Sequence, residues 1–290
     1  MNAVKVERFD YAVIGESVAG VAAAITIARS GGRVVLLNYD RDTDAIADIP
    51  FIRATSLGAH KSGLAFEREV MQVLLEAGGA HLGTAHITAV RRDTGVVVEG
   101  SEEWWSCRGV IFAPNGTEPG LDGSKTLHGF GVSYSASADA SFFSGRRVAV
   151  YGDSPRVYEH ATVAARYASE VVVLVKDGAV DGDARILNDL HQQPSVRFEE
   201  GVVIRSLHAQ DQSLQSIEID SRGGHRTIDV AALFVAQHLV VDKSVLPDAV
   251  TAEDLMLAGL AAGVEYWNHA ALVEDGIRAA QTLMAAVEQR

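Results

Sequence analysis

The sequence predicts an α/β protein with two similar β-α-β domains, and two observations carry this prediction. The first is a strand, a glycine turn, an alanine-rich helix and a second strand in DYAVIGESVAGVAAAITIARSGGRVVLLN, residues 10–38. The second is that the same order and spacing recur in RRVAVYGDSPRVYEHATVAARYASEVVVLVKDG, residues 146–178. With 290 residues, of which 48% are hydrophobic, the chain can bury two such cores.

The elements of the first unit follow from its apolar runs and its glycines. Tyr11–Ile14 and Val34–Leu37 are uninterrupted apolar runs, which predict two buried strands. The helix between them is expected to end near Arg29, because Gly31 and Gly32 follow it.

Weaker signals organise the rest of the chain. The Asp-rich stretch 39–48 predicts a loop, and the apolar spacing within 63–78 predicts an amphipathic helix. Residues 109–113 predict a buried strand, and the Gly-, Ser- and Thr-rich stretch 116–131 predicts a domain boundary. Gly223-Gly224 predicts a hairpin. A C-terminal helix is expected within 272–290, with this apolar face: Ile277, Ala280, Leu283, Met284 and Val287.

The composition of the chain limits which binding partners and which cellular location are expected. The net charge of −13 repels phosphate backbones and so argues against nucleic acid as a partner. No apolar run reaches membrane-spanning length, and the N-terminal residues lack a signal-peptide pattern, so we expect a cytoplasmic protein. The single cysteine, Cys107, excludes a disulfide within the chain and is expected to be a buried thiol. The ten histidines form no metal-binding motif, so no metal site is predicted.

The first glycine turn, GESVAG, has the features of a dinucleotide site. Gly15 permits a tight turn, Ser17 is small enough for a pyrophosphate to approach, and Gly20 lets the helix pack closely on the strand. The helix N-terminus then directs N–H groups at the anion. Asn38 stands at the end of the second strand, where an acidic residue usually binds the ribose. A β-α-β unit without a ligand is the alternative.

The second glycine turn is a poorer dinucleotide site. Asp153 adds negative charge where a phosphate would lie, and Pro155 removes a backbone donor. Lys176 is the one base at the end of the following strand. This turn therefore predicts a retained scaffold with weak nicotinamide binding or none.

The order of these parts resembles the low-molecular-weight thioredoxin reductase family of FAD- and NAD(P)-dependent oxidoreductases. VIGESVAG resembles the family's FAD turn, GVIFAPNG its strand returning to the flavin, and LMLAGL through YWNHAALVEDGIRAA its closing FAD segment. The resemblance implies two Rossmann-like domains with the second inserted into the first. It places an FAD-binding-type domain at 1–117 and 241–290 and an NAD(P)-binding-like domain at 118–240.

The departures from the family fall where its chemistry lies. Within SYSASADASFF, Ser135 and Ala138 stand in place of the redox cysteines, and Asp139 matches the acid after the second one. Disulfide reduction needs a thiolate, so this segment cannot perform it. Leu260 replaces an Asp near the flavin, and Glu274 replaces a small glycine.

The resemblance also implies two sets of site residues. The expected FAD-binding residues are Gly15, Glu16, Ser17, Val18, Ala19, Gly20, Asn38, Ile87, Ala113, Gly116, Gly259, Leu260, Asn268, His269 and Ala270. The residues expected to line a reaction pocket are Ser135, Ser137 and Asp139.

Two functions follow. The first is a flavoprotein oxidoreductase without dithiol chemistry, which would act on a small-molecule substrate or a redox partner protein through FAD. The second is a pseudoenzyme of the same fold that has lost flavin and NADPH and binds another ligand or protein. Family members are commonly homodimers, so a homodimer is expected.

Overall fold

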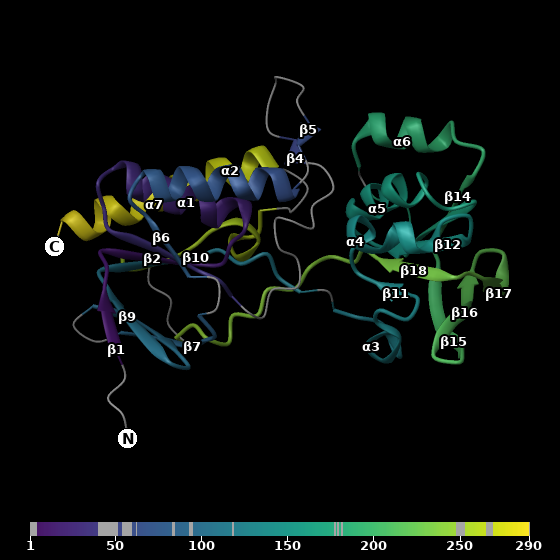
Figure 1. Cartoon of the computed structure of the whole chain (residues 1–290), viewed down its shortest axis with the longest axis horizontal. Coiled ribbons are helices and arrows are strands. Elements are labelled where there is room, and N and C mark those ends of the chain that lie inside the picture. Colours follow the sequence, from purple (N-terminus) through teal and green to yellow (C-terminus); the bar gives the residue numbers. More distant parts are fainter. Residues whose placement is uncertain are drawn as a thin grey trace. The chain divides into compact units, whose positions relative to one another are not determined.

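The structure is a computed structural model of the chain. It describes residues 5–39, 52–53, 60–61, 63–82, 85–92, 95–117, 119–176, 178, 180, 182–247, 253–264 and 269–289. The chain divides into two compact units, one formed by 1–117 with 240–290 and the other by 118–239 (Figure 1). The second unit therefore interrupts the first in sequence.

A five-stranded parallel sheet forms the centre of the first unit. Its order is β19 (Leu255–Leu257), β10 (Gly109–Phe112), β2 (Tyr11–Ile14), β3 (Val34–Leu37) and β6 (Ala80–Leu82). From β2 the chain proceeds outward to β3 and β6, and then returns to β10 on the other side. The order thus reverses between β2 and β10, and open α/β sheets bind ligands at the carboxyl ends of strands at such a point.

Two layers cover this sheet. On one face lie α1 (Val18–Arg29), α2 (Gly63–Glu76) and α7 (His269–Glu288). On the other face lies a second sheet, in the order β1 (Lys5–Arg8), β9 (Glu103–Cys107), β8 (Val96–Gly100) and β7 (Ile87–Arg92). A short pair is formed by β4 (Ile52–Arg53) and β5 (His60–Lys61).

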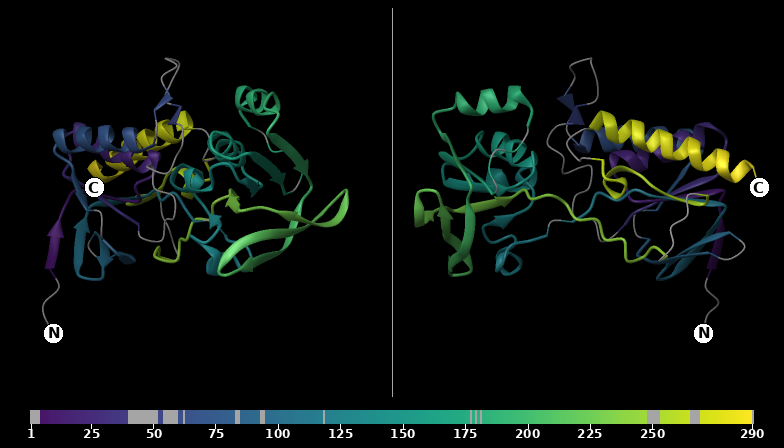
Figure 2. Two further views of the ribbon diagram at one scale, coloured as in Figure 1. Left: turned by 45° about the vertical axis from the view of Figure 1, so that its right-hand side comes forward. Right: turned by 180° about the vertical axis from the view of Figure 1, so that it is seen from behind.

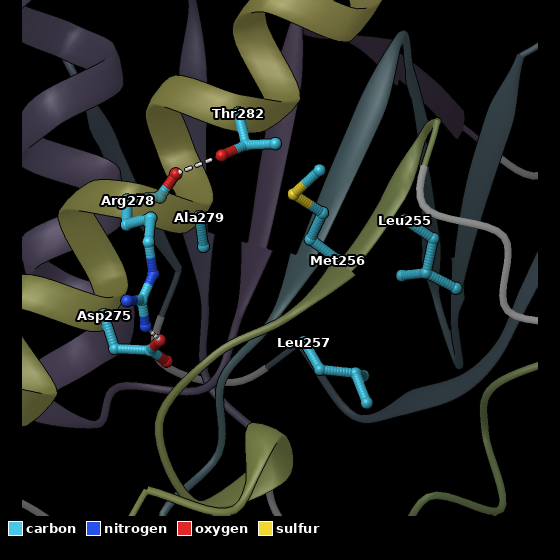
Figure 3. A pocket seen from close by; sticks show the side chains of 7 residues that line it. All are labelled: Leu255, Met256, Leu257, Asp275, Arg278, Ala279 and Thr282. Atoms are coloured by element: carbon cyan, nitrogen blue, oxygen red, sulfur yellow. Dashed lines mark hydrogen bonds and ion pairs between the residues drawn. The ribbon is translucent and has the colours of Figure 1, made fainter.

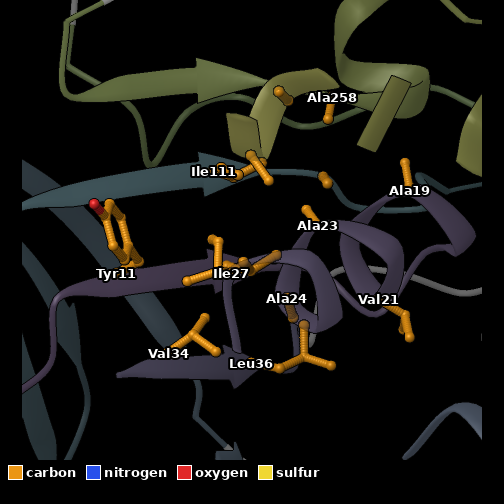
Figure 4. Packing of buried hydrophobic residues seen from close by; sticks show 14 of the residues in the cluster. Tyr11, Ala19, Val21, Ala23, Ala24, Ile27, Val34, Leu36, Ile111 and Ala258 are labelled. Carbon is orange, nitrogen blue, oxygen red and sulfur yellow. The ribbon is translucent and has the colours of Figure 1, made fainter. Parts of the chain in front are cut away.

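The central strands carry apolar side chains on both faces of the sheet, because helices cover one face and the second sheet covers the other. In β2, Tyr11 belongs to the helix-facing core and Ala12 to the core shared with the second sheet. On the helix side, Ile27 of α1 packs against the strands that carry Leu36 and Ile111 (Figure 4). The many alanines of α1 let its backbone approach α7 closely, and a Cβ at Gly276 of α7 would collide with the backbone of α1 at Ala19.

The second unit has the same kind of parallel sheet. Its order is β11 (Val132–Ser133), β18 (Ala232–Val235), β12 (Arg147–Gly152), β13 (Glu170–Val175) and β14 (Val196–Glu200). The helical elements of this unit are α3 (Ser124–Leu127), α4 (Ala136–Asp139), η2 (Ala140–Phe143), α5 (Arg156–Ala164) and α6 (Ala184–His191). An antiparallel sheet of β15 (Val203–Gln210), β16 (Ser213–Ser221) and β17 (Gly224–Asp229) packs on the face opposite α5 and α6 (Figure 2).

The predicted strands at 11–14 and 34–37, the helix ending at Arg29 and the hairpin at Gly223-Gly224 are confirmed. The helix predicted over 63–78 ends at Glu76, because the N–H groups of Gly78 and Gly79 bond back to its last turn. The strand predicted to Ala113 ends at Phe112, and the C-terminal helix begins earlier, at His269.

The polar stretch predicted as a loop at 39–48 lies outside the described residues except for Tyr39. Tyr39 follows β3 outside any strand or helix, as predicted, but its side chain is buried. Tyr39 is 1% exposed, and its ring centroid lies 5.3 Å from that of Phe112 in an edge-to-face arrangement. Its hydroxyl donates a hydrogen bond to the carbonyl of Asp242 at 3.0 Å. Among the described helices, none is both long and apolar enough to cross a membrane.

Candidate functional site

The first glycine turn joins β2 to α1 at the reversal point of the sheet. Gly15 has φ of +105°, and a Cβ there would lie 2.5 Å from the carbonyl oxygen of Ala113. A Cβ at Gly20 would collide with the carbonyl oxygen of Gly15. Both positions therefore require glycine, and together they bring the start of α1 onto the ends of β2 and β10.

Ser17 caps α1 and leaves part of its N-terminus available to a ligand. The Ser17 hydroxyl accepts a hydrogen bond from the N–H of Gly20 at 3.0 Å, and the carbonyl of Ser17 accepts from Val21 at 2.9 Å. Ala19 lies in the first turn of the helix, where no intrahelical carbonyl can reach its N–H. That donor and the positive end of the helix dipole suit a phosphate group.

Two other predicted residues lie beside this turn. The N–H of Ala113 donates to the carbonyl of Ile14 at 2.7 Å, which fixes the end of β10 beside the end of β2. Gly259, with φ of +62°, opens the helical turn η3 (Gly259–Ala262), and a Cβ there would lie 2.9 Å from the Cβ of Ala19. The structure thus brings the turn, Ala113 and Gly259 together at the carboxyl ends of β2, β10 and β19.

Asn38 and Glu16 are joined by their side chains. The Asn38 amide donates to one carboxylate oxygen of Glu16 at 3.2 Å, and the Nε2 atom of His81, on β6, pairs with the other. The Glu16 side chain is only 12% exposed. Its carboxylate is therefore held at the ends of β3 and β6, the side on which dinucleotide sites place an acid for the ribose. His81 lies 65 residues from Glu16 and carries no motif, so the sequence did not indicate it.

The remaining predicted FAD residues have varied positions. Ile87 is 2% exposed and packs in the core between the two sheets of the first unit, so it fills space there as an apolar side chain. Gly116 is buried after β10, and Leu260 is half-buried in η3. His269 is buried and Ala270 exposed at the start of α7, and Asn268 lies outside the described residues.

The α7 helix supplies a residue that the sequence reasoning missed. Asp275 is 7% exposed, and its carboxylate accepts the N–H of Gly259 at 2.8 Å and pairs with Arg278. A carboxylate thus supports the start of η3 from α7, next to the position where Leu260 replaces the family's acid. Glu274 is exposed, and Gly276 is the residue of α7 that meets α1 at Ala19.

A pocket of about 360 Å³ lies beside this support, between β19 and α7 (Figure 3). Its lining residues are Leu255, Met256, Leu257, Asp275, Arg278, Ala279 and Thr282. Arg278 extends across the Asp275 carboxylate, and no residue of the glycine turn lines the pocket. The pocket is therefore distinct from the candidate dinucleotide site.

The residues predicted to line a reaction pocket lie in the second unit. Ser133 accepts the N–H of Ser135 at 3.0 Å and donates to its carbonyl at 3.1 Å. The Ser135 hydroxyl caps α4 by accepting the N–H of Ala138 at 3.3 Å. Ser137 is exposed and Asp139 half-buried on this short helix. The Ser135 hydroxyl therefore has a structural role as the cap of α4. A catalytic role for Ser135, Ser137 and Asp139 stays a prediction.

Cys107 is a structural thiol. It is 4% exposed on β9, and burial raises its pKa to about 12. Since the thiolate is the reactive form, this side chain is inert at neutral pH. Within the described part of the chain, no three His, Cys, Asp or Glu side chains are grouped as metal ligands.

A glycine turn at the reversal point of a parallel sheet, in a unit interrupted by a second unit of the same kind, defines the class of two-domain dinucleotide-binding proteins. Comparison with known sequences gives the family. The profile described as pyridine nucleotide-disulphide oxidoreductase matches residues 9–251. The chain belongs to this family of oxidoreductases, and the similarity to thioredoxin reductases described next agrees with the predicted resemblance.

Individual relatives agree with this assignment. The chain is 29% identical over 195 residues to an alkyl hydroperoxide reductase protein of Pseudomonas putida, and the match covers 66% of this chain and 38% of that protein. It is 27% identical over 209 residues to thioredoxin reductase of Peptoclostridium litorale, covering 69% and 64%. The chain therefore spans less than two thirds of the length of each relative.

The fold is that of solved thioredoxin reductases. The crystal structure of Lactococcus lactis thioredoxin reductase in its FR conformation matches with a TM-score of 0.85 at 17% identity, covering 97% of this chain and all (100%) of that chain. The predicted pair of Rossmann-like domains is thereby confirmed.

Proposed function

We propose that this protein is a flavoprotein oxidoreductase that binds FAD in its first unit and acts without a dithiol of its own. The observation that carries the proposal is the glycine turn that leads from β2 into α1, where Gly15, Gly20 and the N–H of Ala19 form a site suited to a pyrophosphate. The residues present fit the cofactor: the turn would hold the pyrophosphate, and Asn38 with Glu16 would lie toward the ribose.

FAD, when bound, supplies hydride or electron transfer, and the protein supplies position and electrostatics. The chain contains one cysteine, and that thiol is buried, so no cysteine pair accepts electrons within it. The substrate is then a small molecule or a redox partner protein that meets the flavin directly. A homodimer and a cytoplasmic location stay predictions.

The absorption spectrum of the purified protein tests the proposal. We expect the two-band spectrum of a flavin, with FAD released on denaturation. A colourless protein that cannot be reconstituted with FAD would contradict the proposal and support the pseudoenzyme, for which Leu260 in place of an acid is the supporting observation.

A pair of Ser17 variants tests the site itself. Asp and Asn are both good N-caps, so Ser17→Asp and Ser17→Asn should keep α1 folded. Ser17→Asp adds a negative charge beside the pyrophosphate, and we expect at least about a tenfold loss of FAD affinity from charge repulsion. Ser17→Asn controls for side-chain size. If the two variants bound FAD with equal affinity, the pyrophosphate would not lie beside Ser17, and the proposed site would be wrong.

A further inference from the structure

The second glycine turn, between β12 and α5, has no backbone donor left for a phosphate over residues 154–157. The N–H of Ser154 donates to the carbonyl of Ala236 at 3.3 Å, and Pro155 has no N–H. The N–H groups of Arg156 and Val157 donate to the Ser154 hydroxyl at 3.3 Å and to its carbonyl at 3.0 Å. This turn differs from the first, where Ala19 keeps a donor for a ligand.

The Asp153 carboxylate binds donors from the ends of two neighbouring strands. One of its oxygens accepts the backbone N–H of His238 at 2.7 Å and lies 3.2 Å from the His238 Nδ1 atom. The other oxygen accepts from the Lys176 ammonium at 3.3 Å. Lys176 follows β13 and His238 follows β18, and both strands neighbour β12 in the sheet. The carboxylate therefore spans the carboxyl ends of three adjacent strands.

This position corresponds to the place where open α/β sheets bind ligands. From β12 the chain proceeds to β13 and β14 on one side and later to β18 on the other. The order reverses between β12 and β18, where an open α/β sheet receives a dinucleotide. The backbones are also in close contact there, because a Cβ at Gly152 would collide with the carbonyl of Ala236.

Asp153 remains an anion in this position. Burial raises the pKa of its carboxyl, but the hydrogen bonds from His238 and Lys176 outweigh burial and leave the pKa below its ordinary value. A phosphate group that entered the crevice would meet this negative charge and would compete with it for Lys176 and His238.

We propose that Asp153 closes the second unit to nicotinamide dinucleotides by acting as an internal anion in place of their phosphates. NADH and NADPH are then not the electron donors of this protein, and its reductant reaches it by another route. The inference goes beyond the proposed function, because it concerns the second unit and holds whether or not the first unit carries flavin.

Titration of the full-length protein with NADPH and with NADH, followed by nicotinamide fluorescence, tests the proposal. We expect the wild type to bind both with dissociation constants above about 1 mM. Asp153→Ala frees Lys176 and His238, so NADPH should bind at least about tenfold more tightly than to the wild type. NADPH should also be preferred to NADH, since Lys176 then meets the 2′-phosphate, and Asp153→Ala with Lys176→Ala should abolish that preference.

Two further variants keep the test decisive. Asp229→Ala removes one exposed carboxylate from β17 of the same unit, and it should leave NADPH binding at the wild-type level. Asp153→Asn keeps the shape of the side chain and loses only the charge, so it replaces Asp153→Ala if that variant unfolds.

Tight NADPH binding by the wild type would overturn the proposal. So would a folded Asp153→Ala or Asp153→Asn protein that binds NADPH no better than Asp229→Ala does. A colourless wild type that binds neither nucleotide would contradict the flavin proposal and leave this one standing.

Discussion

The carboxylate of Asp275 in α7 accepts the backbone N–H of Gly259 at 2.8 Å and so ties the C-terminal helix to the turn that follows β19. Gly259 is buried, and a Cβ on it would meet Ala19 at the start of α1. The hydrogen bond joins α7 to the turn after β19, and the packing of Gly259 against Ala19 joins that turn to α1, so three segments meet at the candidate FAD site.

Asp275→Ala should destabilise the protein by about 1–3 kcal/mol, because it leaves the buried N–H of Gly259 without an acceptor. Asp275→Asn keeps an acceptor and should cost about 1 kcal/mol or less, since the exposed partner Arg278 makes only a weak surface ion pair. Urea unfolding measures both free energies. Equal losses for the two variants would show that the negative charge, and not the hydrogen bond to Gly259, stabilises the site.

Ser17→Ala should lower the free energy of unfolding by about 1 kcal/mol, because the N–H of Gly20 loses its cap. Ser17→Gly should cost less, roughly 0.3 kcal/mol, since glycine is tolerated at an N-cap. Ser30→Ala, at the exposed end of the same helix, is the matched control and should be nearly neutral. A Ser17→Ala protein as stable as the control would mean that α1 does not depend on this cap.

The fold was predictable from local pattern, whereas much of the site was not. Apolar runs, glycine turns and helix periodicity are short-range signals, so the strands at 11–14 and 34–37 and both turns could be read directly from them. The pairing of Glu16 with His81 joins residues that are 65 positions apart, and no spacing rule indicates it.

Tertiary packing decides some features that the local sequence does not indicate. Tyr39 lies outside the strands and helices, as predicted, yet its ring is buried against Phe112. The register of α7 places Gly276 against Ala19 and leaves Glu274 exposed.

Cys107 should not react with a thiol reagent in the native protein. Burial raises its pKa to about 12, so almost no thiolate is present at neutral pH, and the side chain is only 4% exposed. We expect no labelling by an aromatic disulfide reagent before denaturation and one thiol per chain after it. Rapid stoichiometric labelling of the native protein would contradict this result and would make disulfide exchange with a partner feasible.

The stability that Asp153 contributes should depend on pH in a defined direction. Burial raises the pKa of this carboxyl, but the hydrogen bonds from His238 and Lys176 lower it by more than burial raises it. The folded pKa therefore lies below the ordinary value of 3.8. A carboxyl with a depressed folded pKa binds fewer protons in the folded state than in the unfolded state as the pH falls. Its contribution is therefore complete above about pH 4–5 and is lost as the pH drops through the folded pKa.

The measurement is the difference in unfolding free energy between the wild type and Asp153→Asn, taken by urea unfolding from about pH 7 to about pH 3. The wild type should be the more stable protein at neutral pH, because asparagine keeps the acceptor but loses the charge that Lys176 and His238 meet. The difference should shrink toward the acidic end, as the wild-type carboxyl becomes protonated and neutral like the amide. A difference that stayed constant over this range would show that the charge of Asp153 does not stabilise the closed crevice, and the hydrogen bond to the N–H of His238 would then be its whole structural role.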